Sequence, residues 1–210
     1  MKKIKVKFVG YWDNIDLNGQ LIYRMLSKMY DVELSEEPDY VICGCFGQPY
    51  EYCQYPQVRI MNVGENYIPD FNLIDYAICP YPIEFQDRCY YKPAFVDTSA
   101  YFSKIRSGPR EYPENYLESK QYFANFIAGH ESEYGIRGDF FRMLSRYKRV
   151  ESPGTYLNNT NGEIVSFKDT SKTDFQRKCK FTLCFESTSH DGFITEKLTD
   201  AFYADTIPVY

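Results

Sequence analysis

Short apolar runs recur through the first eighty residues, and a glycine or a proline borders each of them. Residues 4–9 alternate apolar and charged side chains and stop at Gly10, which is typical of a strand before a turn. Between residues 17 and 26 the apolar positions follow helical spacing instead. Three further runs are expected to be buried strands, at residues 39–45, 58–63 and 75–79. Strands separated by helices or loops in this way predict a parallel α/β sheet.

The pattern changes between residues 80 and 118, where prolines and mixed charges predict loops and a crossing segment. It then restarts as a second series of strands and helices. The predicted strands of this half are residues 121–128, 180–186 and 207–210, and the predicted helices are residues 136–147 and a helix from about Thr195. We therefore expect two Rossmann-like α/β halves that face a cleft. The domains are expected at residues 1–110 and 111–210, with the boundary near residues 103–118.

Composition and charge exclude some functions. The 210 residues suffice for one large domain or two small ones. With 24 Lys and Arg against 29 Asp and Glu, the net charge of −5 disfavours binding to nucleic acid, although a local phosphate pocket stays possible. Tyr and Phe are abundant, at 21 and 16 residues. Aromatic rings suit sugar and nucleotide surfaces, but they also fill cores, so their number alone does not decide the function.

The sequence predicts a cytoplasmic protein without a metal site. No apolar run approaches the ~20 residues that span a bilayer. The first residues alternate lysines with apolar side chains, which predicts a strand rather than a signal peptide. The seven cysteines include one close pair, Cys43 and Cys45, and are expected to be reduced. His130 and His190 lie far apart and not at ligand spacing to a cysteine, so we expect no zinc.

Glu65 is the first candidate for chemistry. It follows the predicted strand at residues 58–63 in the segment Gly64-Glu65-Asn66. Parallel sheets bind their ligands at the carboxyl ends of their strands. A carboxylate placed there can accept the proton of a sugar hydroxyl. A turn with a solvated glutamate explains the same three residues.

The second candidate is a possible anion site around Lys197. A strand, a polar loop with Gly192 and a helix follow one another between residues 181 and 202. The N-terminus of such a helix presents unpaired N–H groups to a phosphate. Lys197 adds a cation where the helix dipole favours an acid, which indicates a bound anion. A solvated lysine paired with a nearby acid is the alternative.

Arg137, at the start of the helix predicted over residues 136–147, is the third candidate. A guanidinium can bind a diphosphate through two parallel hydrogen bonds. An exposed helical arginine is the alternative.

Two long segments of the chain carry extended motifs. The first runs from Gly64 to Ala77 and follows the pattern G-E-N…P-x-F-N-L-x-D-Y-A. The second contains Lys180-Phe181, Cys184-Phe185-Glu186-Ser187, Gly192-Phe193-Ile194-Thr195-Glu196-Lys197, Asp200-Ala201-Phe202 and Thr206-Ile207-Pro208-Val209-Tyr210. Together the two segments resemble the signature of one family, the bacterial-type α-1,3/4-fucosyltransferases of the GT10 kind. The resemblance covers nearly the whole chain and is weakest over residues 80–118.

This resemblance implies a GT-B glycosyltransferase with an acceptor half followed by a GDP-fucose half. The implied reaction moves L-fucose, with inversion, to a hydroxyl of an N-acetylglucosamine-containing acceptor such as N-acetyllactosamine, in α-1,3 or α-1,4 linkage. The alternatives are a GT-B transferase that uses another nucleotide sugar and a non-catalytic, truncated module that binds sugar or nucleotide. The implied partners are GDP-fucose and an oligosaccharide. No metal or cofactor is expected, no nucleic acid, and at most a peripheral association with a bacterial inner membrane.

The resemblance also implies roles for single residues. Glu65 matches the family's base, and Arg137 and Lys197 match its diphosphate-binding pair. Glu196 matches a carboxylate that holds nucleotide or fucose hydroxyls, and Phe193 stands near the nucleotide where the family commonly has Tyr. The expected supporting residues are Asn66, Glu186 and Thr195.

The chain departs from the family pattern at two further points. Ser187 stands where the family usually has Asn after Phe-Glu. The sequence stops at Tyr210, before the Trp-Gly that the signature leads to, so we expect an incomplete C-terminal half.

Overall fold

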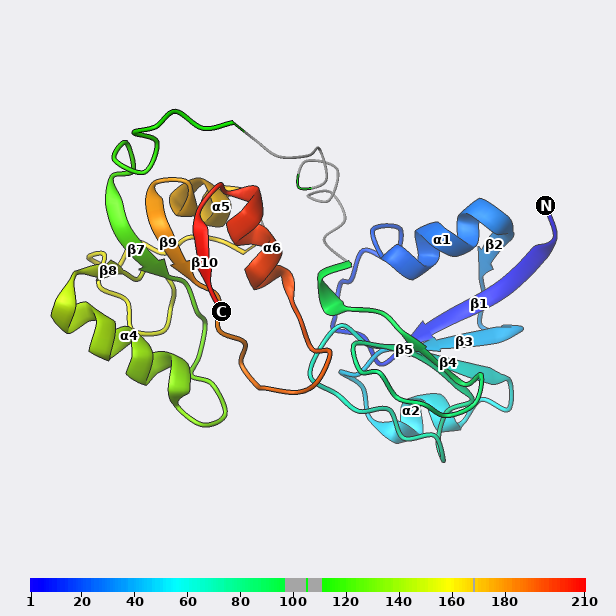
Figure 1. Ribbon diagram of the computed structural model, residues 1–210. Coiled ribbons are helices and arrows are strands. Elements are labelled where there is room, and N and C mark those ends of the chain that lie inside the picture. The colour runs from blue at the N-terminus through cyan, green and yellow to red at the C-terminus, as the bar shows by residue number, and fades with distance from the viewer. Residues whose placement is uncertain (97–104, 106–110, 168) are drawn as a thin grey trace. The chain divides into compact units, whose positions relative to one another are not determined.

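A computed structural model describes residues 1–96, 105, 111–167 and 169–210. The chain forms two compact units (Figure 1): Met1–Asp97 with His190–Phe193, and Thr98–Ser189 with Ile194–Tyr210. Each unit is built around a parallel sheet with helices, as the hydrophobic pattern predicts. The predicted bound between residues 110 and 111 adjoins residues 106–110, which lie outside the described residues. A clear difference concerns His190–Phe193, which the sequence analysis assigned to the second half.

The described part of the first unit contains a sheet of six strands in the order β2-β1-β3-β4-β5-β6. All its pairings are parallel. The strands are β1 (Lys3–Val9), β2 (Asp31–Leu34), β3 (Tyr40–Cys43), β4 (Val58–Asn62), β5 (Tyr76–Cys79) and β6 (Cys89–Tyr91). Helix α1 (Leu21–Met29) and the short α2 (Pro49–Cys53) lie on opposite faces of this sheet (Figure 1).

Three of these elements were not predicted. β2 and β6 are edge strands of four and three residues, and none of these residues is buried, so no apolar run marks either strand in the sequence. β6 also corrects the expectation that residues 80–118 hold only loops and a crossing segment. α2 does have a local signal, because Pro49 stands at its start and Gln48 and Glu51 form a capping box.

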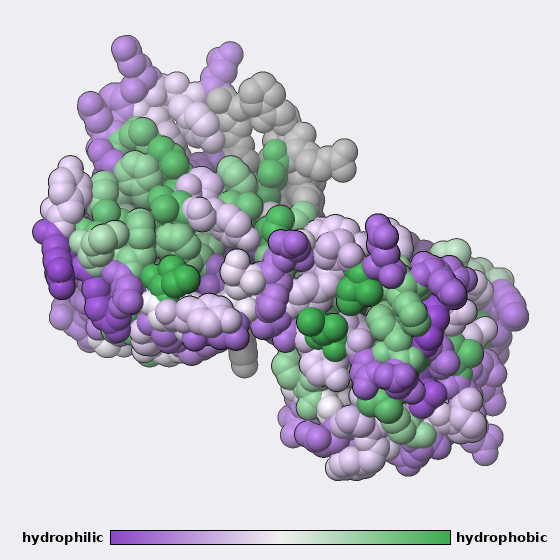
Figure 2. Space-filling view, turned by 60° about the horizontal axis from the view of Figure 1, so that its bottom comes forward, coloured by the Kyte–Doolittle hydropathy of each residue, from purple (hydrophilic) through white to green (hydrophobic). Residues whose placement is uncertain are grey.

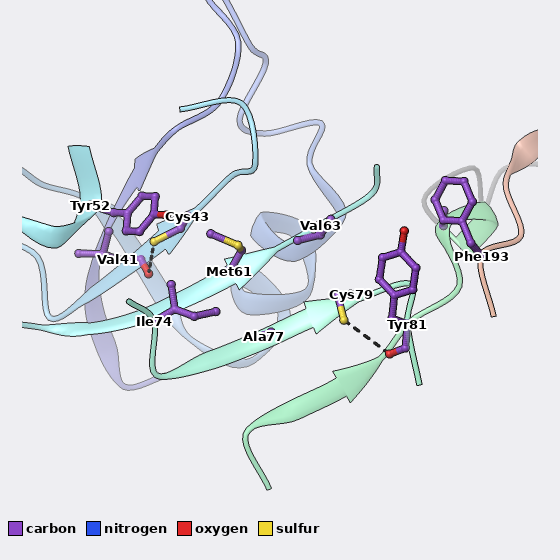
Figure 3. Close-up of a cluster of buried hydrophobic side chains, with 11 residues drawn as sticks. Val41, Cys43, Tyr52, Met61, Val63, Ile74, Ala77, Cys79, Tyr81 and Phe193 are labelled. Carbon is purple, nitrogen blue, oxygen red and sulfur yellow. Dashed lines mark hydrogen bonds between the residues drawn. The ribbon is translucent and has the colours of Figure 1, made fainter. Parts of the chain in front are cut away.

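The core of the first unit includes a residue from far along the chain (Figure 3). Phe193 is buried, and its ring lies nearly parallel to that of Tyr81 at 6.0 Å between centroids. The Tyr91 hydroxyl donates a hydrogen bond to the carbonyl of Gly192 at 3.0 Å. Gly192 has a φ of +80°, and a Cβ there would lie 2.8 Å from Pro82, so only glycine fits. The segment His190–Phe193 is therefore an integral part of this core.

The described part of the second unit contains a sheet of four parallel strands in the order β10-β9-β7-β8. The strands are β7 (Tyr122–Phe126), β8 (Val150–Glu151), β9 (Cys179–Leu183) and β10 (Ile207–Val209). Helix α4 (Ile136–Tyr147) covers one face, and α5 (Ser171–Gln176) and α6 (Glu196–Tyr203) cover the other (Figure 1). α4 and α6 were predicted from the sequence, whereas β8 and α5, which have only two and six residues, were not.

The strand order of the second sheet determines where a ligand is expected. From β7 the chain moves outward to β8, and it then returns past β7 to form β9 and β10 on the other side. Right-handed connections place α4 and the pair α5 and α6 on opposite faces. The direction reverses between β7 and β9, and open parallel sheets bind ligands at the carboxyl ends of the strands at such a point. The loops after β7 and β9 are therefore the expected place for a ligand.

The described residues include neither a membrane-spanning helix nor a metal-binding cluster. No described helix has the length and apolar character needed to cross a bilayer. Within the described residues, no three or more His, Cys, Asp or Glu side chains are grouped as metal ligands would be. The seven cysteines are free thiols. The face seen in Figure 2 mixes hydrophilic and hydrophobic residues over both units.

Candidate functional site

Glu65 lies at the carboxyl edge of the first sheet, in the loop that follows β4. Its side chain is exposed, and its carbonyl accepts a hydrogen bond from the Tyr67 N–H at 2.8 Å, which tightens the loop. The neighbouring Asn66 accepts a hydrogen bond from the Tyr81 hydroxyl and so ties the loop to the core. The structure therefore presents the Glu65 carboxylate where a parallel sheet receives ligands.

Cys45, which follows β3, is a thiol close to Glu65. Burial and the nearby Glu65 carboxylate raise the pKa of the Cys45 thiol to about 11. Cys45 is therefore a neutral thiol near pH 7 and does not compete with Glu65 for an acidic proton.

Two aromatic side chains at the same edge were not singled out from the sequence. Trp12 follows β1 and Phe46 follows β3, and each side chain is half exposed. Their ring centroids lie 5.0 Å apart at an interplanar angle of 88°. The one available signal was that Trp12 is the sole tryptophan of the sequence. Exposed rings held in this way can pack against the apolar face of a sugar.

Arg137 is buried at the carboxyl edge of the second sheet, at the start of α4. Its side chain is only 2% exposed, so the alternative of an exposed surface arginine is excluded. One terminal nitrogen donates a hydrogen bond to the carbonyl of His130, in the loop after β7, whereas the buried Nε makes no hydrogen bond. Burial lowers the pKa of Arg137. The negative charge of Glu131 opposes this shift, because it stabilises the charged guanidinium. Arg137 thus has an unused donor next to the loop that follows β7, where the strand order reverses.

Glu131, which the sequence analysis did not identify, occupies the N-terminus of α4. Its carboxylate accepts hydrogen bonds from the backbone N–H groups of Ser132 at 2.7 Å and Gly138 at 3.1 Å, and from the Tyr156 hydroxyl. Burial opposes ionisation, but these hydrogen bonds hold the pKa of Glu131 below its ordinary value. One carboxylate oxygen lies 4.0 Å from the Arg137 Nε. A carboxylate of the chain itself therefore already occupies this helix N-terminus.

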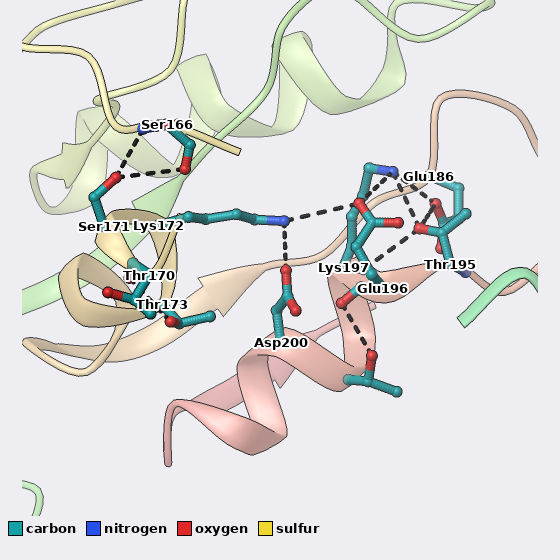
Figure 4. A network of polar contacts seen from close by, with 11 residues as sticks. Ser166, Thr170, Ser171, Lys172, Thr173, Glu186, Thr195, Glu196, Lys197 and Asp200 are labelled. Carbon is teal, nitrogen blue, oxygen red and sulfur yellow. Dashed lines mark hydrogen bonds and ion pairs between the residues drawn. The ribbon is translucent and has the colours of Figure 1, made fainter. Parts of the chain in front are cut away.

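Glu186 and Thr195 connect the end of β9 to the start of α6 (Figure 4). Glu186 accepts hydrogen bonds from the Thr195 backbone N–H at 2.9 Å and from its hydroxyl at 2.7 Å. Thr195 is the N-cap of α6 and accepts a hydrogen bond from the Lys197 backbone N–H. The Lys197 ammonium lies 3.2 Å from Glu186 and 3.1 Å from the Thr195 hydroxyl. The structure thus brings three of the predicted residues into direct contact.

Glu196 and Lys197 are the accessible part of a longer chain of charges (Figure 4). The Glu196 carboxylate lies 3.8 Å from Lys197 and 3.8 Å from Lys172 on α5. Lys172 in turn lies 2.6 Å from Asp200, and both of these side chains are buried. Burial opposes ionisation of Glu196, but Lys197 and Lys172 hold its pKa below the ordinary value. An accessible carboxylate beside an accessible ammonium can bind a molecule that carries both hydroxyl and phosphate groups.

Phe193 requires a correction. The resemblance places it near a bound nucleotide, with Glu196 and Lys197. The structure instead buries its side chain in the core of the first unit against Tyr81. The ring therefore serves packing, and it is not presented to a ligand.

Comparisons with known proteins give matches in both units of the chain. Residues 6–97 match the family model described as alpha-(1,3)-fucosyltransferase FucT N-terminal domain, and residues 117–210 match glycosyltransferase family 10 (fucosyltransferase) C-term. The chain is 27% identical to the alpha-(1,3)-fucosyltransferase FucT of Helicobacter pylori, over 99% of this chain and 50% of that protein. It is 30% identical to human 4-galactosyl-N-acetylglucosaminide 3-alpha-L-fucosyltransferase 9, over 44% of this chain and 24% of that protein.

Solved structures show the same similarity. A crystal structure of an alpha1,3-fucosyltransferase superposes on the whole chain with a TM-score of 0.80 at 26% identity, and the match covers 68% of that protein. A crystal structure of an alpha1,3-fucosyltransferase with GDP-fucose gives a TM-score of 0.77 at 25% identity, over the whole of this chain and 69% of that one. The chain spans about half the length of the curated Helicobacter relative.

Proposed function

Because the chain belongs to glycosyltransferase family 10, the fucosyltransferases, we propose that it transfers L-fucose from GDP-fucose to a hydroxyl of an N-acetylglucosamine-containing acceptor. The proposed linkage is α-1,3 or α-1,4, as on N-acetyllactosamine, and the reaction inverts the anomeric centre without a metal. The observation that carries the proposal is the pair Glu196 and Lys197, which stands partly exposed at the start of α6 beside the carboxyl end of β9. A similar structure that contains GDP-fucose supports the choice of donor.

In this proposal Glu65 is the general base. Its carboxylate takes the proton of the acceptor hydroxyl while that oxygen attacks the anomeric carbon of fucose. The bond between this carbon and the β-phosphate oxygen breaks, and its electron pair leaves with GDP. One displacement with attack opposite to the leaving group inverts the centre. The exposed position of Glu65 after β4 suits a group that must reach an acceptor.

Cations stabilise the departing GDP. Lys197 contributes an ammonium 3.2 Å from Glu186, and a phosphate oxygen would become its additional partner. Arg137 would exchange the His130 carbonyl for a phosphate oxygen, which would also employ its unbonded Nε. Glu196 accepts hydrogen bonds from hydroxyls of the donor, and Glu186 and Thr195 hold the start of α6 in place.

On the acceptor side, Trp12 and Phe46 offer rings to the sugar at the edge that carries Glu65. Burying one ring against a sugar face positions the acceptor without using a charged group. The surrounding loops would then select among acceptors.

Binding of GDP tests the proposal directly. We expect calorimetric titration of this chain to detect GDP and to give much weaker signals with UDP and ADP, since the donor is a guanosine nucleotide. Preference for UDP would indicate a GT-B transferase with another nucleotide sugar. GDP binding without fucosyl transfer to N-acetyllactosamine would indicate a binding module. Failure to bind any of the three would contradict the proposed donor site.

Replacing Lys197 by Ala should weaken GDP binding by about 1–3 kcal/mol, the range of a charge-assisted hydrogen bond. The reason is the loss of the ammonium at the start of α6. The matched control is Lys178→Ala, because Lys178 is exposed and precedes β9, at the opposite end of that strand. Calorimetry should give unchanged affinity for the control. Equal affinities of the Lys197→Ala variant and the unaltered chain would remove Lys197 from the site.

A further inference from the structure

A buried ammonium lies behind the accessible residues of the candidate donor site (Figure 4). Lys172 on α5 is 2.6 Å from the Asp200 carboxylate on α6, and their side chains are only 7% and 5% exposed. The Phe167 ring covers the ammonium at 5.3 Å from its centroid. Removing such a pair from water costs several kcal/mol per ion, and a well-packed apolar pair of the same volume is often as stable. Stability alone therefore does not explain why these charges are present.

Lys172 also faces an accessible carboxylate. Glu196 and Asp200 are four residues apart on α6, so their side chains lie on the same face of the helix, one turn apart. The Lys172 ammonium lies 3.8 Å from Glu196 in addition to its close contact with Asp200. Asp200 therefore fixes the ammonium, and the ammonium attracts the carboxylate that reaches the surface.

Glu196 has two cations at equal distance. The ammonium groups of Lys197 and Lys172 each lie 3.8 Å from the same carboxylate oxygen, Oε1. If Lys172 lost its charge, Lys197 would be the ammonium left within 4 Å of Glu196 among the described residues. Lys197 already lies 3.2 Å from Glu186, and it would then form a closer ion pair with Glu196. Such a pair would occupy both the group that accepts donor hydroxyls and the group that binds phosphate.

We propose that Lys172 is a positioning residue of the donor site. Anchored by Asp200, it holds the Glu196 carboxylate between two ammonium groups, so that Glu196 and Lys197 both stay available to a sugar nucleotide. Lys172 does not itself touch the ligand. This inference rests on the proposed function, because it assigns Glu196 and Lys197 to GDP-fucose.

A double-mutant cycle separates this role from a merely structural one. GDP-fucose affinity is measured by calorimetry for the unaltered chain, Lys172→Met, Glu196→Gln and the double variant. Lys172→Met alone should weaken binding about tenfold, and in the Glu196→Gln background it should change affinity less than about twofold, because coupled residues are not additive. An equal loss in both backgrounds would overturn the proposal. Lys172→Arg, which keeps the charge, should restore most of the affinity.

A second readout does not depend on ligand binding. The pKa of the Glu196 carboxyl, followed by carbon NMR with Glu196→Gln for assignment, should rise in Lys172→Met and stay unchanged in the control Lys178→Met. A Glu196 pKa that does not respond to Lys172→Met would overturn the positioning role. A chain that binds no GDP-fucose but gives the expected NMR shift would instead refute the proposed function alone. If Lys172→Met does not fold, Lys172→Met with Asp200→Asn replaces it, because no buried charge is then left unpaired.

Discussion

Replacing Glu65 by Gln is expected to abolish fucosyl transfer and to leave GDP binding nearly unchanged. Glutamine keeps the size of the side chain but cannot accept the proton of the acceptor hydroxyl. General-base catalysis contributes about 10²–10⁴-fold to a rate, so kcat should fall within that range or below detection. GDP affinity should persist because the residues proposed to bind the diphosphate, Arg137 and Lys197, belong to the second unit. The measurement is transfer to N-acetyllactosamine together with calorimetric GDP binding.

Glu37→Gln is the matched control for this experiment. Glu37 is exposed and lies between β2 and β3, before the amino end of β3, whereas Glu65 follows the carboxyl end of β4. This control should transfer fucose at the rate of the unaltered chain. Transfer by Glu65→Gln at a similar rate would show that another group acts as base.

Replacing Asp200 by Ala should lower the free energy of unfolding by about 3–5 kcal/mol, the usual cost of leaving a buried charge without its partner. The Lys172 ammonium would lose the carboxylate 2.6 Å away and keep Glu196 at 3.8 Å. Urea unfolding followed by circular dichroism measures the change. The effect arises from burial, because both side chains of the pair are almost inaccessible to water.

An exposed ion pair at α5, the helix that carries Lys172, provides the comparison. Asp174 lies 3.6 Å from Arg177, and its side chain is 57% exposed. Asp174→Ala should cost less than about 1 kcal/mol, since water already solvates both groups. If Asp200→Ala proved as mild as Asp174→Ala, the pair of Lys172 and Asp200 would not be buried in solution.

Much of the fold could be predicted because most strands form short apolar or alternating runs that are recognisable in the sequence. The predicted strands around β1, β3, β4, β5, β7, β9 and β10 are confirmed, with ends that differ by no more than three residues. The limits of α4 were predicted without error, since its apolar spacing continues over three turns. β8 and α5 were missed because two and six residues are too few to establish a period. Their existence depends on tertiary contacts, which a local pattern does not report.

The candidate site was predictable only where motif residues act close to one another in the chain. Glu186, Thr195 and Lys197 lie within twelve residues and do meet, as the strand, loop and helix pattern implies. Lys172 could not be found in this way, because the contact with Asp200 spans 28 residues and a lysine in a polar segment is ordinarily solvated. The burial of Arg137 also depends on the loop after β7, whose conformation no periodicity determines.

The docking of His190–Phe193 in the first unit has a consequence for the order in which the protein is made. Although the first unit begins at residue 1, its core lacks the Phe193 ring until that part of the chain has left the ribosome. Until then the Tyr81 ring lacks its stacking contact with Phe193, and the unit is expected to be less stable. Bringing the second segment of this unit back to the first costs entropy, which folding of the intervening residues reduces. A gene fragment that ends at Asp97 would therefore encode an incomplete domain.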